Sequence, residues 1–174
     1  TPQGIVGLFD TPGQILGKHF PADSRNILVC ENISDPGNLG TLLRSAMAFN
    51  FKTVFLCGDC VEAFSPKVIR STAGAVFGLK LFKANFRELK SIIETNDITA
   101  IATVVDGKKW EESTEEIKKA KYLMLIIGSE AEGLSEEMKK LIPLKLRIDH
   151  SNRVESLNAA VAGSILMKEV YDSQ

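Results

Sequence analysis

The chain has 174 residues, of which 44% are hydrophobic and 25% are charged, and its formal net charge at pH 7 is −1. This length and composition fit one compact domain with a buried core and exclude a disordered chain. A charge so close to zero gives no general attraction for nucleic-acid phosphate, so an RNA partner would need a local basic patch or another domain.

Membrane and disulfide signals are both missing from the sequence. No apolar run reaches the length of a membrane span, and no secretory signal is recognisable. The cysteines are three in number, Cys30, Cys57 and Cys60, which favours a reducing compartment. We therefore expect the cytoplasm, with the mitochondrial matrix as the alternative.

Cys57-Gly58-Asp59-Cys60 forms a C-x-x-C pattern, which is typical of metal or redox sites. No second cysteine pair accompanies it, and His19 and His150 lie far away in the sequence. The sequence thus favours a structural role for these cysteines and predicts no metal site.

The elements in chain order predict an α/β fold. The Gly- and Pro-rich residues 1–20 form a lead-in, in which residues 5–9 could pair at a sheet edge, and residues 21–174 form the main domain. Because the chain begins at Thr1, we expect an N-terminal substrate-binding region to be absent. Continuous apolar runs predict buried parallel strands at 27–30, 53–57, 79–82, 98–105, 123–127 and, more briefly, 144–148. Helical periodicity between the runs predicts helices at 39–49, 86–93, 111–121, 138–142 and 156–171, so the sheet is flanked by helices.

Three of the loops that follow predicted strands carry residues beyond what a connection needs. After the first strand, Asp35-Pro36-Gly37-Asn38 forms a turn in which Asn38 can cap the next helix, and Arg44 stands among apolar helix positions. An ordinary turn explains the first feature, whereas the planar guanidinium of Arg44 suits an anionic partner such as phosphate.

The second loop contains Gly128-Ser129-Glu130, in which glycine permits close backbone approach and the carboxylate can bind hydroxyl or amine groups. The third contains Ser156-Leu157-Asn158, in which Ser156 is a suitable helix N-cap and Asn158 falls in the first turn. Ligands of doubly wound folds bind beyond the carboxyl ends of the strands, where all three loops are expected.

These residues, in this order, resemble the three motifs of the SpoU (TrmH-like) RNA methyltransferases, which belong to the SPOUT superfamily. The resemblance rests on Asn38 with Arg44, on Gly128-Ser129-Glu130 with Gly133-Leu134-Ser135, and on Ser156-Leu157-Asn158, and it covers about residues 25–172. The family often has Pro-Met after the isoleucine of the third motif, where this chain has Asp149-His150. It often has glycine after the glutamate of the second motif, where this chain has Ala131.

The resemblance implies a parallel α/β domain with a C-terminal deep trefoil knot and a homodimer. It also implies methylation of a ribose 2′-hydroxyl in RNA, with ribosomal RNA as the favoured substrate, by S-adenosylmethionine. It implies catalytic-site positions at Asn38, Arg44, Glu130, Ser156 and Asn158, and cofactor contacts at Thr103, Gly128, Ile148 and Leu157. Because a guanidinium stays protonated near neutral pH, we expect Arg44 to hold RNA phosphate and stabilise the developing alkoxide instead of acting as a base.

Three alternatives remain at this point. The substrate could be transfer RNA, or the chain could be a non-catalytic RNA-binding or ribosome-assembly protein on the same fold. An unrelated nucleotide-binding enzyme is the third, although neither G-x-G-x-x-G nor a P-loop is present.

Overall fold

The computed structural model describes Asp10, residues 25–151 and residues 153–174. The predicted lead-in of residues 1–20 and its strand at 5–9 lie outside the described residues, apart from Asp10. The described chain forms a six-stranded sheet in the order β3-β2-β1-β5-β4-β6, with every neighbouring pair of strands parallel. The predicted α/β fold with a parallel sheet is therefore confirmed.

Every strand matches a predicted apolar run to within a few residues, apart from the second half of β4. Because the central strands are covered on both faces, their side chains are buried without alternation: β1 and β2 are buried at every position. The strands are β1 (Asn26–Glu31), β2 (Thr53–Cys57), β3 (Lys80–Lys83), β4 (Ile98–Lys109), β5 (Tyr122–Ile127) and β6 (Leu144–Arg147).

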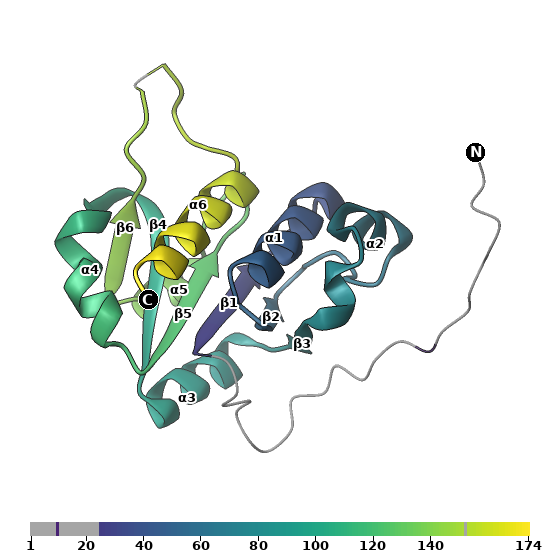
Figure 1. Ribbon diagram of the computed structural model, residues 1–174, viewed down its shortest axis with the longest axis horizontal. Coiled ribbons are helices and arrows are strands. Elements are labelled where there is room, and N and C mark those ends of the chain that lie inside the picture. Colours follow the sequence, from purple (N-terminus) through teal and green to yellow (C-terminus); the bar gives the residue numbers. More distant parts are fainter. Residues whose placement is uncertain (1–9, 11–24, 152) are drawn as a thin grey trace.

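Helices cover both faces of the sheet (Figure 1). One face packs against α1, α2, α4 and α6, and the other against α3 and α5. The helices are α1 (Pro36–Ala48), α2 (Pro66–Thr72), α3 (Phe86–Asn96), α4 (Trp110–Lys119), α5 (Glu136–Lys140) and α6 (Ala159–Asp172), with a short 3₁₀ turn η1 (Ala75–Gly78).

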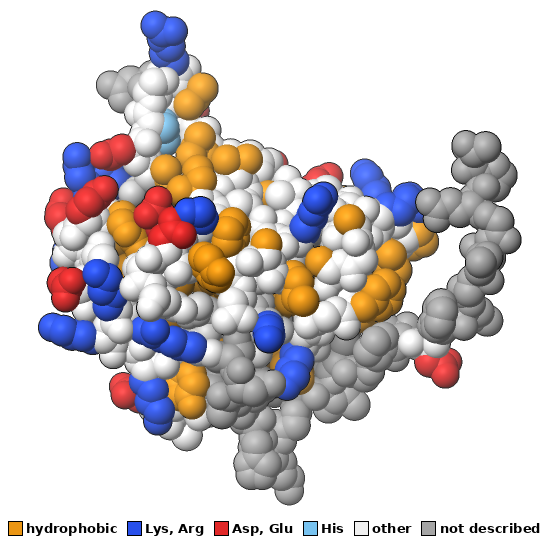
Figure 2. All heavy atoms as spheres, in the orientation of Figure 1, with side chains coloured by type: hydrophobic (Ala, Val, Ile, Leu, Met, Phe, Trp, Pro, Cys, Tyr) orange, Lys and Arg blue, Asp and Glu red, His pale blue; other side chains and the backbone are white. Residues whose placement is uncertain are grey.

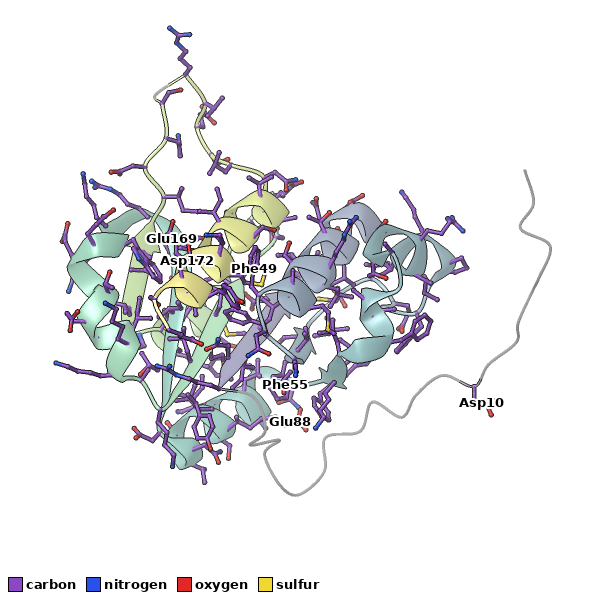
Figure 3. The ribbon with its side chains drawn as sticks, in the orientation of Figure 1. Asp10, Phe49, Phe55, Glu88, Glu169 and Asp172 are labelled. Atoms are coloured by element: carbon purple, nitrogen blue, oxygen red, sulfur yellow. The ribbon has the colours of Figure 1, made fainter. Side chains whose placement is uncertain are left out.

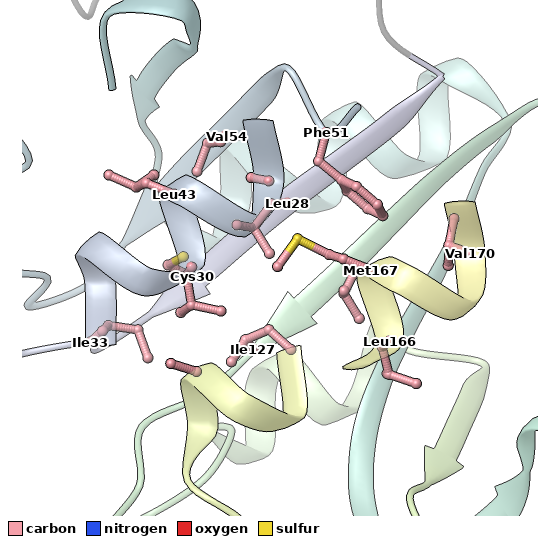
Figure 4. Close-up of a cluster of buried hydrophobic side chains, with 14 of the residues drawn as sticks. Leu28, Cys30, Ile33, Leu43, Phe51, Val54, Ile127, Leu166, Met167 and Val170 are labelled. Atoms are coloured by element: carbon pink, nitrogen blue, oxygen red, sulfur yellow. The ribbon is translucent and has the colours of Figure 1, made fainter. Parts of the chain in front are cut away.

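The larger core lies between the sheet and the helices α1 and α6. Phe51 and Met167 are fully buried there against Leu28 of β1, and Ile127 of β5 closes the cluster (Figure 4). At the far ends of the two helices, the ring of Phe49 lies 5.9 Å from that of Tyr171, beside the part of α6 that carries Glu169 and Asp172 (Figure 3). These contacts fix α6 against α1, which determines where the N-terminus of α6 points.

Two helices start at other residues than predicted, because a neighbouring residue occupies the N-cap position in each. Helix α1 begins at Pro36, and its N-cap is Asp35, whose carboxylate accepts from the Asn38 backbone N–H at 2.8 Å. Helix α6 begins at Ala159, with Asn158 as its N-cap. Asn38 and Ser156 are therefore not caps, and Asn158 stands before the first turn instead of within it.

Strand β4 runs four residues beyond its predicted end and contains an irregularity. Thr103 and Lys108 both align with Leu146 of β6, so the chain between them bulges out of the ladder. A Cβ atom on Gly107 would lie 2.4 Å from the Leu146 carbonyl carbon, which requires glycine at this close approach. The bulge therefore lies beside Leu146, near the carboxyl end of β6.

Among the described residues, none of the helices combines the length and the apolar character that crossing a bilayer requires.

Candidate active site

Three polar side chains from the three motif loops meet at the carboxyl edge of the sheet. The amide nitrogen of Asn158 donates to Asn38 Oδ1 at 3.0 Å and also to Glu130 Oε1. Asn38 lies in the first turn of α1, Glu130 in the loop after β5, and Asn158 at the start of α6. Asn158 is 120 positions from Asn38 and 28 positions from Glu130 in the sequence, and the parallel topology brings the three side chains into one cluster.

The orientation of the Asn158 amide is fixed by its role as a helix cap. Its Oδ1 accepts from the backbone N–H groups of Ala160 at 2.9 Å and Val161 at 3.1 Å. Because the oxygen is used in this way, the nitrogen must point away from α6, toward Asn38 and Glu130. The helix cap thus positions the donor of the polar cluster.

The loop that carries Glu130 is a compact unit. The backbones of Ser129 and Gly133 exchange hydrogen bonds of 3.1 and 3.0 Å, and the Ser129 hydroxyl accepts from the Glu132 N–H at 3.1 Å. A Cβ atom on Gly128 would lie 2.3 Å from the Gly133 carbonyl carbon. Glycine at position 128 is therefore required by close backbone packing within the loop.

A pocket next to this cluster contains most of the predicted cofactor residues. Thr103, Ile148 and Leu157 line it, together with the predicted catalytic residue Ser156. The pocket is open to solvent, and the space within it is about 510 Å³ when the open mouth is counted. Leu157 and Ser156 directly precede Asn158, so the pocket and the polar cluster are joined by one short segment.

Two predicted residues lie elsewhere. Arg44 is exposed on α1, and since it follows Asn38 by six residues it stands about 9 Å further along the helix axis and on another side of it. Gly128 is not among the residues that line the pocket. The structure thus brings together Asn38, Glu130 and Asn158, groups Thr103, Ile148, Ser156 and Leu157 nearby, and leaves Arg44 apart from both sets.

Three polar residues of the pocket were not predicted as pocket residues. Arg147, His150 and Glu155 line the pocket. His150 stands out in the sequence only as a departure from the third motif, and Arg147 and Glu155 carry no periodic or motif signal. Next to them, Asp149 bridges Arg147 and Lys109, with oxygen–nitrogen distances of 3.0 Å to each. Hydrogen bonds from Lys109 and Arg147 lower the pKa of the Asp149 carboxyl, so this bridge ties the loop after β6 to the end of β4.

The cysteines form a packed structural group. The Cys60 thiol lies 3.3 Å from the Cys30 carbonyl oxygen and 3.4 Å from that of Cys57, as a donor to both. Burial raises the pKa of all three thiols, and that of Cys57 reaches about 11 with a further contribution from the charge of Glu31. Within the described part of the chain, no group of three or more metal-binding side chains is found.

The chain is similar to known RNA methyltransferases over most of its length. It is 36% identical over 159 residues to a tRNA/rRNA methyltransferase of Synechocystis, covering 88% of this chain and 56% of that protein. It is 29% identical over 168 residues to the 23S rRNA (guanosine(2553)-2′-O)-methyltransferase of Bacillus subtilis, covering 96% of this chain and 64% of that protein. The chain therefore spans somewhat more than half the length of these relatives.

A solved structure shows the same architecture. The AdoMet-bound rRNA methyltransferase of Sinorhizobium meliloti superposes with a TM-score of 0.78 at 29% identity, covering 85% of this chain and 56% of that one. The model of the SpoU rRNA methylase family matches residues 25–168, which include all three motif loops. The chain belongs to the SpoU rRNA methylase family.

Proposed function

We propose that this chain is the catalytic domain of an enzyme that methylates a ribose 2′-hydroxyl in RNA with S-adenosylmethionine, and that the RNA is ribosomal. The observation that carries the proposal is the cluster of Asn38, Glu130 and Asn158 at the side of a pocket lined by Thr103, Ile148 and Leu157. The relatives named above, which act on rRNA or on tRNA and rRNA, support the substrate class.

The pocket residues fit the chemistry of the cofactor. Ile148 and Leu157 offer apolar surface for an adenine ring, whereas Glu155 offers a carboxylate for the positively charged amine or sulfonium groups. The β4 bulge provides the room, since Thr103 and Val104 at its start line the same pocket. When bound, the cofactor would supply a methyl group on a sulfonium, which is already a strong electrophile.

The residues of the chain then have to align the ribose hydroxyl. The amide of Asn158 is held rigidly by its own helix and by Glu130, and such pre-set orientation contributes several kcal/mol, up to about 7–11, in favourable systems. Ser156 stands in the pocket wall, where its hydroxyl can bind a polar group of either ligand. Arg44, as a planar cation, holds RNA phosphate and stabilises the developing alkoxide.

The separation of Arg44 from the cluster supports a homodimer in which two chains complete each site. Helices α1 and α6 cover one face of the sheet, and hydrophobic side chains gather on this side of the molecule (Figure 2). The exposed apolar side chains of the two helices include Met47, Val161 and Tyr171. Val161 and Tyr171 are 46% and 52% exposed. A second copy packed on these helices would cover that apolar surface and bring an Arg44 to the neighbouring pocket.

The trefoil knot is part of the same proposal. Helix α6 returns from edge strand β6 to pack on α1 and β5, so the last segment crosses β4 and reaches the loop after β5. Asn158 and Glu130 meet where these two segments come together. This return path supports the knotted arrangement that the family resemblance implies.

The test is mass-spectrometric mapping of methylated riboses in RNA from cells that lack the gene, before and after incubation with the purified chain and S-adenosylmethionine. One ribose that is unmethylated in the deletion strain and regains its methyl group is the expected result. A modified position in transfer RNA would replace the ribosomal substrate, and RNA binding with no methylation would establish a non-catalytic protein on this fold.

A further inference from the structure

Glu31 is a buried carboxylate at the carboxyl end of β1, and no step of the proposed reaction uses it. The residue is 5% exposed, and both of its oxygens accept from Ser135. The Ser135 backbone N–H donates to Oε2 at 3.0 Å, and the Ser135 hydroxyl donates to Oε1 at 2.6 Å. A buried carboxylate is costly unless it is well hydrogen-bonded, so this pair has a narrowly defined geometry.

No cation balances this carboxylate within residues 25–151 and 153–174, in which the ion pairs involve other residues. The charge of Glu31 is instead felt by Cys57, the residue beside it in the β1–β2 ladder, whose pKa it helps to raise. Ser135 thus provides both of the hydrogen bonds described for the buried Glu31 carboxylate.

Ser135 is the residue at which the loop after β5 ends and α5 begins. The loop is fixed at its other end by β5, and it is closed on itself by the bonds between Ser129 and Gly133. Leu134 is 6% exposed and anchors the exit of the loop in the core. Glu130 stands on the exposed side of this unit, where it contacts Asn158.

We propose that Glu31 is a positioning residue for the methyl-transfer site: by holding Ser135, it sets the location of the loop that presents Glu130 to Asn158. The inference rests on the proposed function and deepens it. The loop has two fixed ends, one in β5 and one at Glu31, and loss of the second would let Glu130 move relative to Asn158. A displacement of about 1 Å at a reacting site can reduce the rate by about 100-fold.

Ser135 has a second function that the test must separate from the first. Its hydroxyl oxygen accepts from the Met138 N–H at 3.1 Å and so caps α5. In Ser135→Asp, the new side chain can still accept a hydrogen bond as the N-cap of α5, but it cannot donate one to Glu31 Oε1. The substitution also places a second carboxylate next to that of Glu31. In the double variant with Glu31→Gln, the new amide can donate to the new carboxylate and restore the contact.

The experiment combines amide hydrogen exchange of residues 129–135 with the rate of labelled methyl transfer from S-adenosylmethionine to total RNA of cells lacking the gene. Glu31→Gln and Ser135→Asp are each expected to speed exchange in the loop by about 10-fold or more, while affinity for S-adenosylhomocysteine changes by less than about 3-fold. The transfer rate is expected to fall by about 10–100-fold. The exchange rate of residues 129–135 in the double variant is expected to return toward the wild-type rate. Ser135→Thr, which keeps the hydroxyl, is expected to exchange at about the wild-type rate.

Asn85→Ala is the matched control, because Asn85 caps α3 through the Glu88 N–H at 3.0 Å and makes no hydrogen bond to the polar cluster among the described residues. It is expected to speed exchange in α3 alone. The inference would be overturned if residues 129–135 of Glu31→Gln exchanged at the wild-type rate. It would also be overturned if Asn85→Ala sped exchange of residues 129–135 as much as Glu31→Gln does. If the wild-type chain transfers no methyl group, the proposed function fails, whereas the exchange comparison still decides whether Glu31 fixes the loop.

Discussion

At the scale of single residues, Asn158 links the start of a helix to the polar cluster that we propose as the methyl-transfer site. Its oxygen caps α6 and its nitrogen joins Asn38 and Glu130. The order of the motifs in the sequence indicated that these residues belong to one site. Their direct contact could not be predicted, because it depends on how α6 packs against α1.

Asn158→Asp separates the two functions of this side chain. The carboxylate retains the cap, so the free energy of unfolding is expected to change by less than about 0.5 kcal/mol. It also replaces the amide donor with an acceptor that repels Glu130, so methyl transfer is expected to fall by about 100-fold. Chemical denaturation and single-turnover rates measure the two effects, and normal transfer by this variant would remove Asn158 from the site.

The cysteines allow a prediction of pH dependence. With a pKa of about 11, Cys57 is only about 0.1% thiolate at pH 8, compared with roughly a quarter for an ordinary cysteine. Because the shift is upward, alkylation by iodoacetamide should be slow at pH 8 and rise about tenfold per pH unit toward pH 11. Mass spectrometry of labelled peptides measures this, and labelling of Cys57 at the rate of free cysteine at pH 8 would contradict the structural role.

The contact between Glu31 and Ser135 could not be predicted from the sequence. A glutamate that follows a buried strand resembles any charged residue at the start of a loop, and Ser135 resembles an ordinary helix cap. Only the fold shows that the two are bonded across 104 positions of the chain. Pairings of this kind need a tertiary structure, since neither residue type is unusual where it stands.

At the scale of the elements, the apolar runs located all six strands, because strands buried on both faces need continuous apolar residues. The second half of β4 was missed, since Gly107, Lys108 and Lys109 are not apolar and are held in the strand by pairing with β6. Helix α2 was also missed, because seven residues are too few for a clear helical period. The local sequence pattern therefore predicted the buried strands, but it missed elements whose conformation depends on tertiary contacts or whose length is too short for a clear period.

The packing of α6 against α1 and β5 provides a stability prediction. A Cβ atom on Gly163 would lie 2.6 Å from Leu42 Cδ2 and 3.2 Å from Ile127 Cγ1. Gly163→Ala is therefore expected to destabilise the fold by about 1–3 kcal/mol despite the better helix propensity of alanine. Urea denaturation measures the change, and a variant more stable than the wild type would show that α6 packs less closely than described.

At the scale of the whole molecule, the proposed homodimer would cover the exposed apolar side chains of α1 and α6. Val161→Glu places a charge at a 46% exposed apolar position of that face. We expect it to shift a dimer to monomers in sedimentation experiments while leaving the circular dichroism spectrum unchanged. Thr95→Glu, on α3 at the other face of the sheet, is the control, and a wild-type chain that sediments as a monomer at high concentration would contradict the dimer.

Calorimetric titration with S-adenosylmethionine measures whether the pocket beside Asn158 holds the methyl donor, as we propose. We expect one cofactor to bind per chain, and we expect Thr103→Lys to abolish binding because it places a long cation in the pocket that must accept a sulfonium. Thr99→Lys, at the other end of β4, should bind as the wild type does. Unchanged binding in Thr103→Lys, or no binding by the wild-type chain, would contradict the account.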